Sequence, residues 1–153
     1  MTKIDIVLPE KIFAGTRATL EKEFAPHFLA EAADREALIA QIAPRVRAIA
    51  RGNHIAIDRA LIDRFPNLEI ISVFGVGYDG VDVAYARERG LVVTNTPDVL
   101  NEEVADYTIG LLVMTARELL RAERYLRDGS WARLGQFAPV PGSLRDRTVG
   151  MVG

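Results

Sequence analysis

Apolar runs and helical patterns alternate along the first part of the chain. The apolar runs, which predict short strands, are residues 4–8, 28–30, 46–50, 68–74 and 91–95. The segments with apolar side chains at helical spacing are residues 17–25, those that follow Asp34 and Asp58, and residues 81–89. Strands that alternate with helices indicate an α/β fold with a doubly wound parallel sheet of flavodoxin-like topology.

Local signals within this part of the chain support the predicted elements. Asp34 and Asp58 precede two of the helices and are suitable N-caps, and Gly90 is suitable as the end of the last one. The run at 68–74 is almost wholly apolar, which predicts a strand that is covered on both faces of the sheet.

The pattern changes after Pro97 and Asp98. From Asn101, a suitable N-cap, to Leu126, apolar residues recur at helical spacing and predict one long helix that Gly129 ends. Such a helix is longer than a crossover in a compact sheet requires. We therefore expect a domain boundary here, with one domain at residues 1–97 and the start of a second domain at residues 98–153.

The last residues of the chain, 148–153, form an apolar run that leads into glycine. This pattern predicts the first strand of a Rossmann domain, with Gly153 as the first glycine of a turn that binds a dinucleotide pyrophosphate through backbone N–H groups. A lone strand has no sheet with which to pair, so we interpret the chain as part of a longer protein.

Composition restricts the class of partner. Nineteen basic and 21 acidic residues give a net charge of −2, which leaves no basic surface for nucleic acid or anionic lipid and favours a small-molecule partner. The absence of cysteine excludes disulfides, cysteine metal ligands and a thiol nucleophile, and no other metal site is predicted. The chain has no signal-peptide pattern, and its longest apolar stretch, 109–116, is too short to cross a bilayer. We expect a cytoplasmic protein with no membrane role.

A turn with three glycines follows the most apolar strand, at residues 74–82. Ligands bind at the carboxyl edge of an open parallel sheet, and glycines there allow the backbone to approach an anion, with Asp79 or Asp82 capping the next helix. Arg51 and Gly52 end another strand at the same edge, so a carboxylate between the two loops would meet backbone donors and a guanidinium. The alternatives are a tight turn without a ligand and a solvated surface arginine.

Three motifs together resemble a known family. They are residues 74–82 (FGVGYDGVD), residues 90–100 (GLVVTNTPDVL) and the sequence Val104-Ala105-Asp106 at the start of the long helix. In combination they are similar to the D-isomer-specific 2-hydroxyacid dehydrogenases, most of all to the hydroxypyruvate, hydroxyphenylpyruvate and glyoxylate reductase branch. The resemblance extends from about residue 43 to the end of the chain.

The resemblance implies a reductase that transfers hydride from NADPH or NADH to the carbonyl carbon of a small 2-oxo acid. It places the substrate domain before the long helix and the cofactor domain after it. Val76 and Gly77 would bind the substrate carboxylate through backbone N–H groups, and Thr108 would lie near the nicotinamide. The catalytic arginine, glutamate and histidine of the family lie beyond Gly153, so none is assigned here, and neither His27 nor His54 matches the family histidine.

Two questions remain open at this point. The family also allows a non-catalytic relative that senses a nucleotide or binds a partner protein. Trp131 is suitable for a core or for a subunit interface, and the wide apolar stripe of the long helix, continued by Leu134 and Phe137, favours a homodimer.

A response-regulator receiver is rejected, because the acidic cluster and the aspartate that such a domain needs are absent from the corresponding strand ends.

Overall fold

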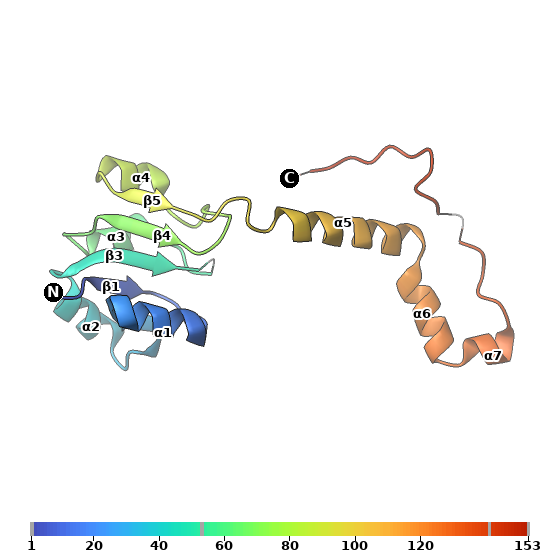
Figure 1. Cartoon of the computed structure of the whole chain (residues 1–153), viewed down its shortest axis with the longest axis horizontal. Helices are drawn as coiled ribbons and strands as arrows, with labels where there is room; N and C mark the ends of the chain where they lie inside the picture. The colour runs from blue at the N-terminus through green and yellow to red at the C-terminus, as the bar shows by residue number, and fades with distance from the viewer. Residues whose placement is uncertain (1, 53, 141, 153) are drawn as a thin grey trace. The chain divides into compact units, whose positions relative to one another are not determined.

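The computed structural model describes residues 2–52, 54–140 and 142–152, and the chain divides into two compact units (Figure 1). The first unit is Met1–Val99 and the second is Leu100–Gly153.

The first unit contains a parallel sheet of five strands in the order β2-β1-β3-β4-β5. The strands are β1 (Asp5–Leu8), β2 (Ala25–Phe28), β3 (Val46–Arg51), β4 (Ile70–Val73) and β5 (Val92–Thr94). This order is that of a flavodoxin-like, doubly wound sheet, because the chain moves outward from β1 in one direction to β2 and in the other to β3, β4 and β5. The predicted fold class is confirmed.

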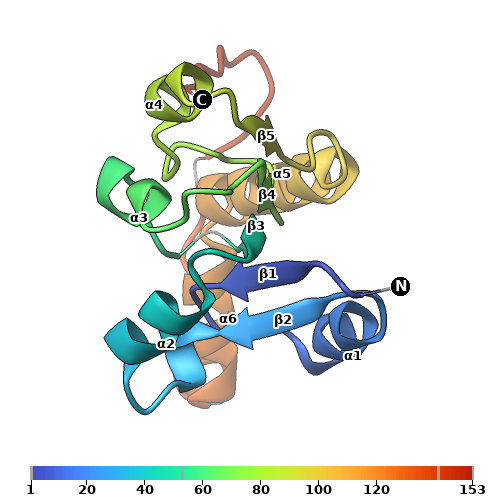
Figure 2. The same ribbon diagram turned by 90° about the vertical axis from the view of Figure 1, so that its left-hand side faces the viewer.

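Helices cover both faces of this sheet unequally. They are α1 (Ala14–Glu23), the 3₁₀ turn η1 (Leu29–Glu31), α2 (Arg35–Ile42), α3 (Arg59–Asp63) and α4 (Val83–Glu88). Figure 2 shows α1 on one side of the sheet and α2, α3 and α4 on the other. Asp34, Asp58 and Asp82 each accept a hydrogen bond from a backbone N–H in the first turn of the following helix, and Gly90 has a φ of 70° after α4.

The core lies on the face that α2, α3 and α4 cover. Ile39 and Ile42 of α2, Ile62 of α3 and Ala86 of α4 pack with strand residues such as Ile71 into one buried cluster. By contrast, α1 buries none of its residues. Burial of this one apolar face is the main stabilisation of the unit.

The expectation that the strand at 68–74 is covered on both faces was wrong. In β4, Ile71 and Val73 are buried but Ser72 between them is exposed, and Phe74 is 64% exposed. Successive side chains of a strand point to opposite faces, and the helices α2, α3 and α4 all lie on one of them.

The second unit consists of α5 (Asn101–Ala116), α6 (Leu119–Arg127) and α7 (Ser130–Leu134), so the prediction of one long helix was wrong. The helix breaks at Glu118, whose φ of 51° lies in the left-handed region, and the backbone carbonyl of Glu118 then accepts hydrogen bonds from the first turn of α6. The apolar spacing continues across this turn and therefore does not reveal it. Gly129, with a φ of 76°, follows α6 as expected.

The expected Rossmann strand at 148–153 is also not formed in the described residues. Residues 148–152 have no strand partner, and Met151 and Val152 are almost fully exposed. A strand requires a neighbour for its backbone hydrogen bonds, and every strand of the described chain belongs to the first unit. None of the described helices is long and apolar enough to span a membrane.

Candidate functional site

The candidate site lies at the carboxyl edge of β3 and β4 in the first unit. Arg51 ends β3 beside Val73, the last residue of β4, and the N–H of Phe74 donates to the carbonyl of Arg51 at 2.7 Å. The glycine turn at 74–82 therefore starts directly beside the end of β3. This is the edge at which open parallel sheets bind ligands.

Hydrogen bonds from neighbouring strands and loops fix the glycine turn. The side chain of Asn95, just after β5, donates to the carbonyl of Val76 at 2.8 Å, and the N–H of Thr96 donates to the carbonyl of Gly75 at 2.9 Å. The carbonyl of Gly80 accepts from Ile57 at 2.7 Å. Gly75, Val76 and Gly80 are thus held through their carbonyl groups.

Asn95 is a residue whose role was not recognised from the sequence. The signal was present, because Asn95 follows a strand that was predicted beside β4 at the same edge of the sheet. Its amide group orients the peptide that joins Val76 to Gly77, one of the two groups expected to bind the substrate.

The N–H groups of Val76 and Gly77 donate to no acceptor within the part of the chain that the structure describes. Both residues are exposed. A Cβ atom placed on Gly77 would meet only the carboxylate of Asp79, at 3.7 Å, so space is present beside this glycine. Two adjacent, exposed backbone donors of this kind can bind an anion.

Arg51 is neither a solvated surface arginine nor an open side chain in the site. Only 4% of Arg51 is exposed, its Nε donates to the carbonyl of Gly52, and its Nη1 is buried without a hydrogen-bond partner among the described residues. A Cβ atom on Gly80 would lie 2.6 Å from that Nη1. The guanidinium therefore packs against the backbone of the glycine turn, and glycine at position 80 is what makes room for it.

Glu10 is a second buried charged residue that the sequence reasoning missed. It follows β1 at the same edge, is 6% exposed, and has an Oε1 atom without a hydrogen-bond partner in the described chain. A Cβ atom on Gly52 would lie 3.1 Å from this oxygen. The carboxylate of Glu10 therefore lies beside the Cα atom of Gly52, the glycine that we expected to bind substrate.

The remaining predicted residues, Thr108 and Gly153, belong to the second unit. Thr108 lies on α5 in the second unit, where its hydroxyl donates to the carbonyl of Val104 at 2.6 Å. Gly153 falls outside the described residues. His27 of β2 is hydrogen bonded through Nε2 to the carboxylate of Asp5 at 2.7 Å, which agrees with a structural role, and His54 is exposed.

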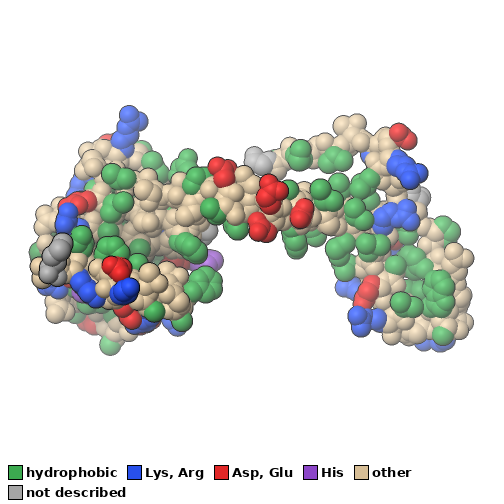
Figure 3. Space-filling model, in the orientation of Figure 1, with side chains coloured by type: hydrophobic (Ala, Val, Ile, Leu, Met, Phe, Trp, Pro, Cys, Tyr) green, Lys and Arg blue, Asp and Glu red, His purple; other side chains and the backbone are tan. Residues whose placement is uncertain are grey.

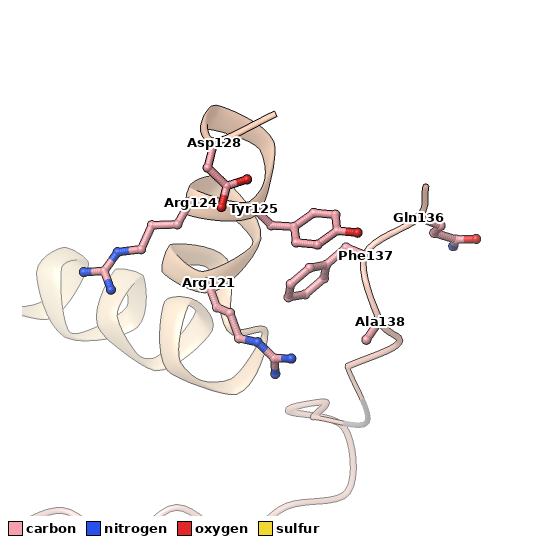
Figure 4. Close-up of a pocket in the computed structure, with 7 residues that line it drawn as sticks. All are labelled: Arg121, Arg124, Tyr125, Asp128, Gln136, Phe137 and Ala138. Carbon is pink, nitrogen blue, oxygen red and sulfur yellow. The ribbon is translucent and has the colours of Figure 1, made fainter. Parts of the chain in front are cut away.

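A hollow of about 400 Å³ lies in the second unit, between α6 and residues 136–138 (Figure 4). The ring of Phe137 stacks edge-on against Tyr125, and the guanidinium of Arg121 lies 5.2 Å from the centre of the Phe137 ring. Arg121 and Arg124, which line this hollow, are exposed at the surface. The described residues also contain no group of three or more His, Cys, Asp or Glu side chains that could hold a metal ion.

Comparisons with known proteins agree with the motifs of this edge. Residues 6–143 match the family model of the D-isomer specific 2-hydroxyacid dehydrogenase catalytic domain. The chain is 42% identical over 108 residues to a glyoxylate/hydroxypyruvate reductase A of Arabidopsis thaliana, covering 71% of this chain and 34% of that protein. It is 38% identical over 135 residues to the hydroxyphenylpyruvate reductase of Plectranthus scutellarioides, covering 88% and 42% respectively.

A solved structure extends the agreement to three dimensions. The NADPH-dependent glyoxylate/hydroxypyruvate reductase of Sinorhizobium meliloti, in complex with NADP and malonate, is 44% identical and superposes with a TM-score of 0.83 over 99% of this chain and 46% of that one. The chain thus spans less than half the length of these relatives. The chain belongs to the D-isomer specific 2-hydroxyacid dehydrogenase family.

Proposed function

We propose that the protein containing this chain reduces a small 2-oxo acid, such as glyoxylate or hydroxypyruvate, to the D-2-hydroxy acid with NADPH or NADH. One observation carries the proposal: the N–H groups of Val76 and Gly77 are exposed and unpaired in the described chain, at the ligand-binding edge of the sheet. The names of the relatives support the substrate class, and the NADP complex of the Sinorhizobium meliloti enzyme supports the cofactor class.

In this proposal the glycine turn binds the substrate carboxylate. The N–H groups of Val76 and Gly77 donate to its oxygens. The N–H of Thr96, which donates to the carbonyl of Gly75, orients the peptide that carries the Val76 donor, and Asn95 orients the peptide that carries the Gly77 donor. Gly52 lets the end of β3 approach the same ligand, while the buried guanidinium of Arg51 packs against Gly80 and supports the turn. The bound acid is thereby oriented rather than activated by this chain.

The nicotinamide cofactor supplies the hydride when it is bound. We propose that residues 98–153 begin the domain that holds it, with Thr108 near the nicotinamide and Gly153 in the phosphate-binding turn, and that residues 1–97 form the substrate domain. The family resemblance places the groups that protonate the carbonyl oxygen and grip the carboxylate beyond Gly153. The expectation of a cytoplasmic location rests on the sequence and stays a prediction.

We also propose that the second unit mediates a homodimer. Large apolar side chains are exposed along all three of its helices, and Figure 3 shows them (green) gathered over this unit. Trp131 is 52% exposed and Leu134 is 70% exposed, so neither is a core residue of this chain. Apolar surface of this extent is usually covered by a partner, and closed pairs are the commonest assemblies.

The activity proposal is tested with the full-length protein. NADPH and NADH oxidation are followed with glyoxylate and with hydroxypyruvate, and we expect turnover with at least one pair. The isolated chain of residues 1–153 is the control and should show no turnover, because the family catalytic residues are absent from it. Binding of a nucleotide by the full-length protein without any turnover would contradict the proposal and indicate a non-catalytic relative.

A further inference from the structure

Two buried charges of opposite sign lie beneath the substrate edge of the first unit. Glu10 is 6% exposed and Arg51 is 4% exposed. Each has one buried polar atom without a hydrogen-bond partner among the described residues, Oε1 of Glu10 and Nη1 of Arg51. A buried, unsatisfied charged group is costly, so a protein that keeps two of them at one edge requires a physical explanation.

Gly52 lies between the two side chains. Its carbonyl accepts a hydrogen bond from Nε of Arg51, and a Cβ atom at this position would lie 3.1 Å from Oε1 and 3.4 Å from Cδ of Glu10. The sheet register explains the juxtaposition, because Val7 of β1 pairs with Ile49 of β3 and the two chains continue side by side to Glu10 and Gly52. Both charges therefore act on the same loop of the site.

The guanidinium of Arg51 also lies against the second loop of the site. Its Nη1, Nη2 and Cζ atoms would be 2.6, 3.1 and 3.2 Å from a Cβ atom on Gly80, the last glycine of the turn that includes Val76 and Gly77. With Glu10 present, the two buried charges sum to zero. Without Glu10, an uncompensated positive charge would lie against the turn, in a medium that screens charges weakly.

We propose that Glu10 is a specificity-determining residue that cancels the charge of Arg51 and so restricts the site to 2-oxo acids with a single carboxylate. The backbone donors of Val76 and Gly77 suffice for one carboxylate. A dicarboxylic 2-oxo acid brings a second negative charge, which two buried charges that sum to zero do not compensate and an unbalanced Arg51 would attract. This inference rests on the proposed function, because it concerns the substrate class of the same site.

The test measures kcat/KM of the full-length protein for glyoxylate and for oxaloacetate, in the native protein and in Glu10→Gln. We expect the ratio of oxaloacetate to glyoxylate to rise about ten-fold in the variant, the size of one charge interaction across a partly screened distance. Most of the change should appear as a lower KM for oxaloacetate. A merely structural role of Glu10 would move both substrates together.

Controls separate this inference from its alternatives. Glu23→Gln makes the same charge change at the end of α1, directly before β2 begins and hence at the opposite edge of the sheet, and should leave the ratio unchanged. Glu10→Asp retains the charge and should retain the preference for glyoxylate. Glu10→Met, an apolar side chain of similar length that needs no hydrogen-bond partner, is the second charge-removing variant and should shift the ratio as Glu10→Gln does.

The outcomes are distinguishable from failure of the proposed function. If the native protein turns over neither acid, the activity proposal fails. If it reduces glyoxylate but folded Glu10→Gln or Glu10→Met leaves the ratio unchanged, the role of Glu10 in specificity is overturned. Loss of folding in both variants would also overturn it, because it would show that the carboxylate serves the fold.

Discussion

Both units of this chain have apolar residues at helical spacing, but α2, α3 and α4 of the first unit bury theirs and the helices of the second do not. In the first unit, α2, α3 and α4 bury their apolar residues against a sheet, and Ile49, Ile62 and Phe65 have no exposed surface. In the second unit, α5 and α6 bury no residue and α7 buries only Ser130. The comparison shows that helical spacing of apolar residues predicts a helix but does not specify what covers it.

This difference assigns the two units separate tasks. The first unit has its own core and can hold the loops of the substrate edge in fixed positions. The second unit presents apolar surface that other protein must cover, which is the basis for proposing a dimer and a longer cofactor domain. Substitutions in each unit test this contrast.

The core of the first unit should be the most sensitive part of the chain. Phe65→Ala removes a fully buried ring and is expected to lower the free energy of unfolding by about 3–5 kcal/mol. Circular dichroism during urea unfolding of the 153-residue chain measures this. Leu134→Ala, at a 70% exposed position of the second unit, is the control and should change the value by less than about 0.5 kcal/mol. A similar loss of unfolding free energy in both variants would contradict the difference in burial between the two units.

The apolar surface of the second unit should determine the oligomeric state. Trp131→Ala combined with Leu134→Asp is expected to convert the full-length dimer into a monomer in sedimentation at micromolar concentration, because it removes an aromatic contact and places a charge in the interface. Phe13→Asp changes a side chain that is 77% exposed in the first unit and should leave the mass unchanged. A stable dimer with a lowered melting temperature would instead show an intramolecular role for Trp131.

The glycine turn should control substrate binding without controlling stability. Gly77→Val in the full-length protein is expected to raise KM for 2-oxo acids about 10-fold or more, with little effect on KM for the cofactor, because the added side chain obstructs a charged hydrogen bond. Gly15→Val in α1 is the matched control, since a Cβ atom there meets nothing within 4 Å. An unchanged KM in a folded Gly77→Val protein would remove the carboxylate role from the turn.

The smallest expected effect is the pH dependence of one ion pair. The hydrogen bond from His27, helped by the charge of Arg45, holds the pKa of Asp5 below its usual value, which stabilises the fold above the pKa of an unfolded aspartate, about 3.9. That stabilisation is lost as the pH falls through the lower pKa of the folded state. Asp5→Asn should therefore reduce stability at pH 6–7, and its difference from the native chain should shrink as the pH falls below about 3.9.

A counterpart in the second unit controls for this effect. The hydrogen bonds that Asp128 accepts from Ser130 also lower the pKa of Asp128, but this carboxylate is exposed and solvent screens it. Asp128→Asn should produce the smaller change when urea unfolding is followed between pH 3 and 7. A difference for Asp5→Asn that stays constant as the pH falls below about 3.9 would show that packing, rather than charge, explains it.

Features that depend on local bonding could be predicted from the amino-acid sequence alone. The caps at Asp34 and Asp58 need only a backbone N–H three residues away, and the left-handed turns at Gly90 and Gly129 need only the absence of a side chain. The alternation of short strands and helices determined the parallel sheet, and the motifs at 74–82 and 90–100 identified the family. These signals lie within a few residues or in residue order, so they can be seen in the sequence.

Which distant residues meet depends on the tertiary structure. The placement of β1 beside β3 brings Glu10 to Gly52, and the placement of β5 beside β4 brings Asn95 to Val76. The burial of Arg51 depends in the same way on the neighbouring turn, which is why its charge could be predicted from sequence and its surroundings could not. Strand order results from packing of the whole sheet against its helices, and no short stretch of the chain contains that information.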